Sequence, residues 1–82
     1  MSAAAARRLP EAGLDDAVVV GAEIVAGHDG AAELLVRLRH GNGAVSHVTL
    51  DAATGFDLMR AGRAASLDGL VGQAWRRLIR EL

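Results

Sequence analysis

Hydrophobic and polar residues alternate most regularly between Glu33 and Leu50, in the stretch ELLVRLRHGNGAVSHVTL. Successive side chains of a β-strand point to opposite faces, so this pattern is typical of two half-buried strands. The glycine-rich segment between them, Gly41-Asn42-Gly43, has the composition of a tight turn. The stretch therefore predicts a β-hairpin.

The register of this hairpin depends on the length of its turn. A two-residue turn at Asn42-Gly43 would place Leu38 and Val36 opposite polar residues of the second strand. A three-residue turn over 41–43 instead pairs Val36 with Val48 and brings the large apolar residues to one face. We choose the three-residue turn, because a one-residue slip would turn a whole face over. Gly43 is then expected to adopt a positive φ.

A first strand is predicted over 17–26, AVVVGAEIVA, which is rich in β-branched residues. Its single charge, Glu23, assigns the faces. The expected inward residues are Val18, Val20, Ala22 and Ile24, and the expected outward residues are Val19, Gly21, Glu23 and Val25. A second three-residue turn, over 28–30, sets Ile24 opposite Leu34 and so agrees with the first hairpin. The predicted unit is a three-stranded antiparallel meander.

After Leu50 the hydrophobic period changes from two to about 3.6, which indicates helix. Asp51 is a good N-cap for a helix that runs to Ala61, with Phe56 and Met59 on one face. Gly62 is expected to be the C′ residue that ends it. Gly55 within this helix costs roughly 1 kcal/mol relative to alanine.

A second helix is predicted after Ser66, with a continuous apolar stripe that covers the inner face of the sheet. The stripe comprises Leu67, Leu70, Val71, Ala74, Trp75, Leu78, Ile79 and Leu82. The basic residues of its last turns are Arg76, Arg77 and Arg80, which suit the helix dipole. The predicted fold class is therefore α+β, in the order βββαα.

Composition and length bound the organisation of the chain. Its 82 residues favour one small domain, over 17–82, preceded by an arm over 1–16 that we expect to be flexible or weakly helical. The chain contains no cysteine, so neither disulfides nor thiolate metal sites are available. No transmembrane run or secretory signal is recognisable, which makes the cytoplasm of a bacterium the expected location.

Candidate chemistry is sparse, and we expect neither enzymatic activity nor a cofactor. In the meander, His28 and His40 lie at opposite ends of one strand, too far apart to share a metal ion with His47. Both glycine-rich turns lead into strands rather than helices, so neither has the helix N-terminus that typically binds phosphate. Catalysis by His47 would require a neighbouring carboxylate in a cleft, which a flat sheet does not offer.

Arg37, Arg39 and His47 are predicted to share the outer face of the sheet, with Arg37 directly opposite His47. Cross-strand neighbours of this kind can form a small anion site or a partner contact. A nucleic-acid surface is not expected, because the net charge is −1 and the predicted strands carry no aromatic residue.

The outer face also carries apolar residues, and these indicate an interaction surface. The predicted dimer or partner surface comprises Val19, Glu23, Val25, Leu35 and Val45. The first strand is an edge strand without proline or lysine, and such edges are rarely left bare. We expect a homodimer in which this strand pairs with its mate or the outer faces pack together. The functional hypothesis is a non-enzymatic adaptor module; the alternative is an accessory protein that binds an anionic ligand through Arg37, Arg39 and His47.

Overall fold

The computed structural model describes residues 17–82. The strands are β1 (Val18–Ala26), β2 (Ala32–Arg39) and β3 (Val45–Asp51), and they are followed by α2 (Ala52–Ala61), the 3₁₀ helix η1 (Leu67–Leu70) and α3 (Trp75–Arg80). The α+β class is therefore confirmed. The arm predicted for 1–16 lies outside the described residues.

The three strands form an open antiparallel sheet in the order β1-β2-β3. Both predicted registers are confirmed: Ile24 pairs with Leu34 across β1 and β2, and Val36 pairs with Val48 across β2 and β3. The hydrophobic match between strands was sufficient to set both, because any slip would have exposed the large side chains of β2.

The two turns are built alike. Gly30 and Gly43 have φ angles of 88° and 90°. In each turn the central side chain, Asp29 or Asn42, accepts a hydrogen bond from the backbone N–H two residues later. Positive φ is inexpensive only for glycine, which explains the shared sequence form.

A β-bulge at Val20 changes the faces of the first half of β1. The register shifts between Val19 and Gly21, so that Val20 has no opposite residue in β2. Val19 consequently points inward opposite Leu38 and is fully buried, whereas Val20 is exposed. The prediction that Val18 and Val20 point inward and Val19 outward was therefore wrong. It assumed strict alternation, which a bulge interrupts.

Helix α2 begins and ends at the predicted residues, but the left-handed residue that follows it is not the predicted one. The Asp51 carboxylate accepts a hydrogen bond of 2.8 Å from the backbone N–H of Thr54, as an N-cap should. At the C-terminus the left-handed residue is Arg63, with φ 52°, and Gly62 is helical. The prediction of Gly62 as C′ was wrong by one residue. Gly62 is buried, and a Cβ at this position would lie 3.0 Å from side-chain atoms of Gln73, Leu70 and Leu78, which would have to move to admit it.

The predicted second helix is interrupted. After η1 the chain turns at Gly72, with φ 92°, and becomes helical again only at Trp75. Between these points it runs beside β1: the backbone of Gly72 and Gln73 bonds to Val19, and the N–H of Trp75 bonds to the carbonyl of Ala17. These bonds satisfy backbone groups in the first half of the β1 edge. This pairing with β1 takes the place of the continuous second helix that the hydrophobic pattern favours.

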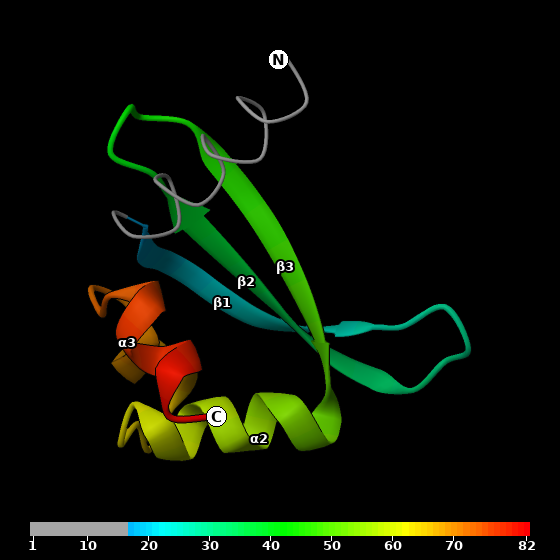
Figure 1. The fold of residues 1–82 in the computed structure, drawn as a ribbon. Helices are drawn as coiled ribbons and strands as arrows, with labels where there is room; N and C mark the ends of the chain where they lie inside the picture. The colour runs from blue at the N-terminus through cyan, green and yellow to red at the C-terminus, as the bar shows by residue number, and fades with distance from the viewer. Residues whose placement is uncertain (1–16) are drawn as a thin grey trace, which may run out of the picture.

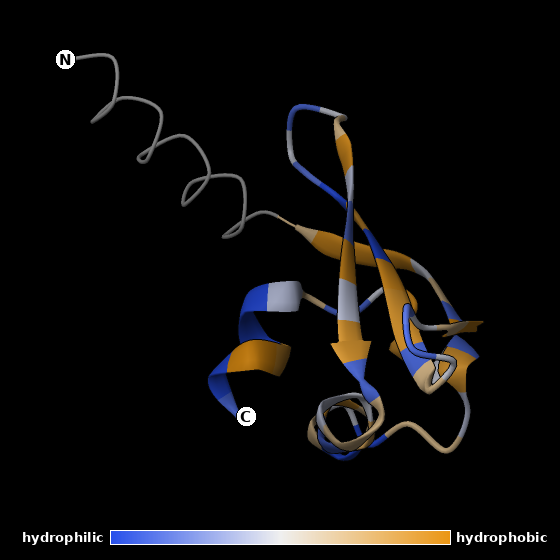
Figure 2. Cartoon of the chain, turned by 90° about the vertical axis from the view of Figure 1, so that its right-hand side faces the viewer, coloured by the Kyte–Doolittle hydropathy of each residue, from blue (hydrophilic) through white to orange (hydrophobic). Residues whose placement is uncertain are grey.

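The helices lie on one face of the sheet, and α2 runs across its lower end (Figure 1). α2 contacts β2 and β3, α3 contacts α2, and η1 contacts β1, so the cover is shared among these elements. Hydrophobic and polar residues alternate along the strands in Figure 2, as the sequence pattern requires. The fully buried core is composed of Ala17, Val19, Val36, Leu38, Leu58, Leu70 and Leu78, with Leu34 and Trp75 nearly so.

Candidate interaction surface

The predicted basic group lies on the outer face of the sheet. Arg37 is directly opposite His47, and Arg39 is opposite Val45, two residue pairs further along β2 and therefore on the same face. The guanidinium of Arg37 also meets the Glu23 carboxylate, with 3.5 Å between Nη1 and Oε2. Glu23 thus competes with any external anion for Arg37. At this exposure the pair itself stabilises the fold little.

The backbone of β1 comes close to the same arginine. Gly21 is buried, and a Cβ at this position would stand 2.6 Å from Nη2 of Arg37. The side chain of Arg37 therefore lies over Gly21 on its way to Glu23. The predicted outward direction of Gly21 and Glu23 is consistent with this contact.

The predicted apolar patch on the outer face is smaller than expected. Val19 does not belong to it, because the bulge at Val20 turns Val19 into the core. Val25 and Leu35 are half-buried, and Val45 is exposed. These residues remain on the outer face, beside the Arg37–Glu23 ion pair.

The edge of β1 is only partly free. Its first half is covered by residues 72–75, whose hydrogen bonds reach as far as Val19. Among the described residues, no backbone hydrogen bond to another segment is present on the outer side of Gly21 to Ala26. The hairpin that contains this part of β1 extends beyond the helices (Figure 1). The free edge, defined as residues 21–26, is therefore shorter than the sequence suggested.

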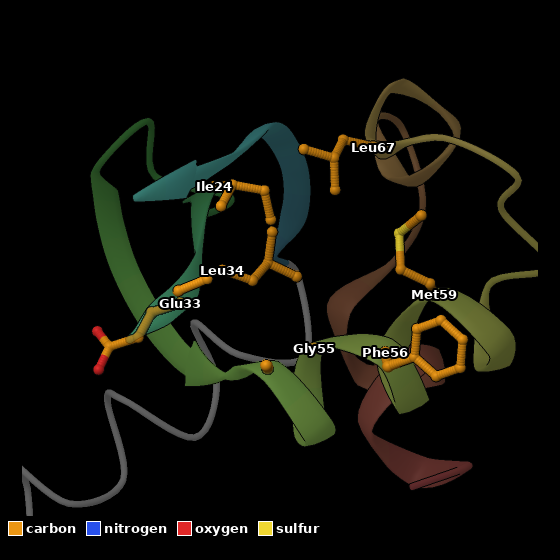
Figure 3. Close-up of a pocket in the computed structure, with 9 residues that line it drawn as sticks. Ile24, Glu33, Leu34, Gly55, Phe56, Met59 and Leu67 are labelled. Carbon is orange, nitrogen blue, oxygen red and sulfur yellow. The ribbon is translucent and has the colours of Figure 1, made fainter. Parts of the chain in front are cut away.

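An apolar groove lies beside this free edge, on the inner face. It has a volume of about 220 Å³. Leu34 lies between the strand side, where Ile24 projects, and the helical side, where Phe56, Met59 and Leu67 project (Figure 3). Glu33 also borders the groove, but its carboxylate points away from it (Figure 3). No charged group therefore enters the groove from the residues that the figure labels.

Two side chains of the groove are unusually exposed for their size. Ile24 is 61% exposed although it lies on the inner face of the sheet, and Phe56 is 68% exposed. The expected cover fails here because α2 packs against β2 and β3 and leaves the end of β1 open. Sequence reasoning missed this groove. Phe56 could have indicated the groove, because it lies on the apolar face of its predicted helix and the sequence suggested no residue that would cover it.

The histidines lie on separate turns and strands of the described chain rather than in one cluster. The Nε2 atom of His40 lies 2.7 Å from Oγ of Ser46, and this histidine is half-buried. Within residues 17–82, no group of three or more His, Asp or Glu side chains is close enough to hold a metal ion. In the same range, no helix is long and apolar enough to cross a membrane.

Comparisons with protein-family models, with curated proteins and with solved structures found no match to this chain. The candidate function therefore rests on the free edge of β1, the apolar groove and the outer-face charges.

Proposed function

We propose that the protein is a small non-enzymatic module for protein–protein interaction that works as a homodimer in the bacterial cytoplasm. Its contact surface is the free edge of β1 together with the apolar groove. The outer face, which the sequence favoured equally, has lost Val19 to the core and keeps only a small apolar patch around Val45.

The observation that carries this proposal is the position of Ile24. Its side chain is 61% exposed on the inner face and borders the groove, and it belongs to the part of β1 that no other segment of residues 17–82 pairs with on its outer side. A strand added at this edge would satisfy backbone groups and cover Ile24 in one step. Strand addition of this type combines main-chain hydrogen bonds with side-chain pockets.

The other edge of the sheet is a poorer candidate. Besides Val45, the outer face of β3 carries His47, Thr49 and Asp51, and these three polar residues gain less from burial than apolar ones. The edge of β1 carries alanine and isoleucine beside the groove. Burial of apolar surface is the main driving force of association, so it favours β1.

Absolute mass by size-exclusion chromatography with light scattering tests the proposal over a dilution series. The parent protein is expected to be a dimer, and Ile24→Asp is expected to be a monomer, because it would bury two carboxylates at the contact. Val45→Asp is the matched control, since Val45 is similarly exposed at 54% but lies on the outer face. Circular dichroism verifies that both variants fold.

A monomeric parent at every concentration would overturn the homodimer. A dimer that survives Ile24→Asp but dissociates with Val45→Asp would move the contact to the outer face. Either result would refute the proposed surface.

A second candidate function is the binding of an anionic ligand by Arg37, Arg39 and His47. The direct opposition of Arg37 and His47 favours it. Titration with inorganic phosphate, followed by NMR, should then show binding that Arg37→Ala with Arg39→Ala abolishes without a change in mass. Glu23→Gln should strengthen that binding, because it removes the competing carboxylate. Unchanged spectra up to millimolar phosphate in both the parent and Glu23→Gln would exclude an anion site.

A further inference from the structure

The hydrogen-bonding direction of each residue in the free edge follows from its two ends. At one end, the N–H of Gly27 donates to the carbonyl of Ala31, toward β2. At the other end, the backbone of Val19 bonds to Gly72 and Gln73, away from β2. Bonding direction alternates along a strand of an antiparallel sheet, and the bulge at Val20 adds the one residue that brings the two ends into agreement. Ala22, Ile24 and Ala26 therefore direct their N–H and C=O groups outward.

A second copy can use this edge in only a few ways. Two identical antiparallel strands related by a two-fold axis pair so that each outward residue meets another outward residue. The axis can then pass through Ala22, Glu23, Ile24, Val25 or Ala26. The surroundings of the edge distinguish these possibilities.

An axis at Ala22 is blocked. It would place the second copy's Ala26 opposite Val18, where Ala74 already forms a bridge. An axis at Glu23 would place two carboxylates directly opposite each other, and like charges in this arrangement are destabilising. Both positions are therefore unfavourable.

An axis beyond Ile24 leaves part of the edge without a strand partner. With the axis at Val25, Ala22 would lie opposite His28 of the second copy, which belongs to the turn. An axis at Ala26 would pair fewer residues still. With the axis at Ile24, Ala22 pairs with Ala26 in both directions and all three outward residues are satisfied.

We infer that the second copy binds by antiparallel pairing of β1 with β1, with Ile24 opposite its own mate. This inference rests on the proposed function and adds the register of the contact. The two sheets then join into one, with three strands from each copy. Glu23 lies opposite Val25 of the second copy, so the carboxylates are separated. The two Ile24 side chains meet on the inner face, and the grooves open on either side of them.

Single cysteines test this register, because the chain contains none of its own. Residues opposite each other in a hydrogen-bonded antiparallel pair have Cα atoms about 5.5 Å apart, within the range of about 4.4–6.8 Å for disulfides. Under mild oxidation, Ile24→Cys is expected to form a covalent dimer. Ala22→Cys and Ala26→Cys should each remain uncrosslinked alone and should crosslink when the two proteins are mixed.

Val45→Cys is the control for crosslinking by random collision, since Val45 is exposed on β3, the strand at the opposite edge of the sheet. Thiols held opposite each other act at an effective concentration of about millimolar, so at micromolar protein Ile24→Cys should react about tenfold faster or more. Light scattering on each reduced variant shows whether it still assembles.

The outcomes separate the register from the assembly. Fast crosslinking of Ile24→Cys alone, together with the mixed Ala22 and Ala26 pair, supports the inference. A reduced dimer in which Ile24→Cys reacts no faster than Val45→Cys overturns the register while the proposed homodimer stands. Fast reaction of Ala22→Cys or Ala26→Cys alone also overturns it. A protein that is monomeric throughout refutes both.

Discussion

Gly55 of α2 lies against Leu34 of β2, so closely that a Cβ added at Gly55 would stand 3.0 Å from the Cβ of Leu34. Because the Leu34 Cβ is attached to the strand backbone, it cannot move aside as a flexible side-chain end would. The glycine that weakens this helix locally is therefore what allows the helix to approach the sheet. The close contact between α2 and β2 also forms the base of the groove, since both Gly55 and Leu34 line it.

Gly55→Ala is expected to destabilise the protein despite the better helix propensity of alanine. Overpacking costs typically about 1–3 kcal/mol, and the gain in propensity returns at most about 1 kcal/mol. Urea denaturation should show a lower midpoint with an unchanged slope. A higher midpoint would mean that α2 can shift away from Leu34 without loss.

Arg63→Gly is expected to stabilise the protein by roughly 0.5–1 kcal/mol, because the φ of 52° at Arg63 strains any residue with a Cβ. The bonds from Arg63 N–H to Arg60 O and from Ala64 N–H to Met59 O identify this residue as the C′ position of a Schellman motif. Thermal unfolding measures the effect. Gly62→Ala is the matched comparison and should destabilise, since its Cβ would stand 3.0 Å from the core side chains of Leu70 and Leu78. The reverse order of the two variants would contradict the assignment of C′.

The N-cap of α2 makes stability depend on pH at the acidic end. The backbone N–H of Thr54, and then its side chain, donate to the Asp51 carboxylate and lower its pKa below the ordinary value. A group whose pKa is lower in the folded state contributes stability above its unfolded pKa of about 3.9, and this is lost as the pH falls through the folded value. Asp51→Asn, which can still accept the bond, should unfold with a shallower dependence on pH below about 4. Identical acid profiles for the parent and Asp51→Asn would contradict this role.

Gln73 joins three segments. Its Nε2 donates to the carbonyls of Gly62, at 2.8 Å, and Gly69, at 2.9 Å, and its Oε1 accepts from Arg77. Gln73→Ala should cost about 1–3 kcal/mol, because the partly buried carbonyl of Gly62 loses its partner. Chemical denaturation measures the loss, and Gln73→Glu should not restore it, since a carboxylate cannot donate. A neutral effect would mean that water replaces the amide at Gly62.

The sheet was predictable because two kinds of evidence agreed at each turn. The turn residues required positive φ at Gly30 and Gly43, and the hydrophobic match required the same loop lengths. The N-cap at Asp51 was predictable for a similar reason, as it depends on a few adjacent residues. Features set by local chemistry were thus accessible from the sequence.

Features set by distant contacts were not. The stripe from Leu67 to Leu82 fits a helix, but the backbone groups at the edge of β1 attract residues 72–75, and Gly72 permits the turn. Val71, Ile79 and Leu82 of that stripe are exposed as a result. The bulge at Val20 is another such feature, and so is the groove, whose existence depends on where α2 comes to rest on the sheet. In contrast, Arg37 and His47 meet as predicted, because the register alone determines that pair.

The bonds from Gly72 and Gln73 to Val19 also bear on aggregation. Without them, a foreign chain would find an open template along most of β1, a strand of nine residues. Fibril-forming segments are typically six or seven residues of high β-propensity with low net charge. The C-terminal segment and the bulge leave only the stretch from Gly21 to Ala26, with Glu23 at its centre. The part of the chain that breaks the expected helix therefore also shortens the edge that is open to templated fibre growth, and the residues left open include the charged Glu23.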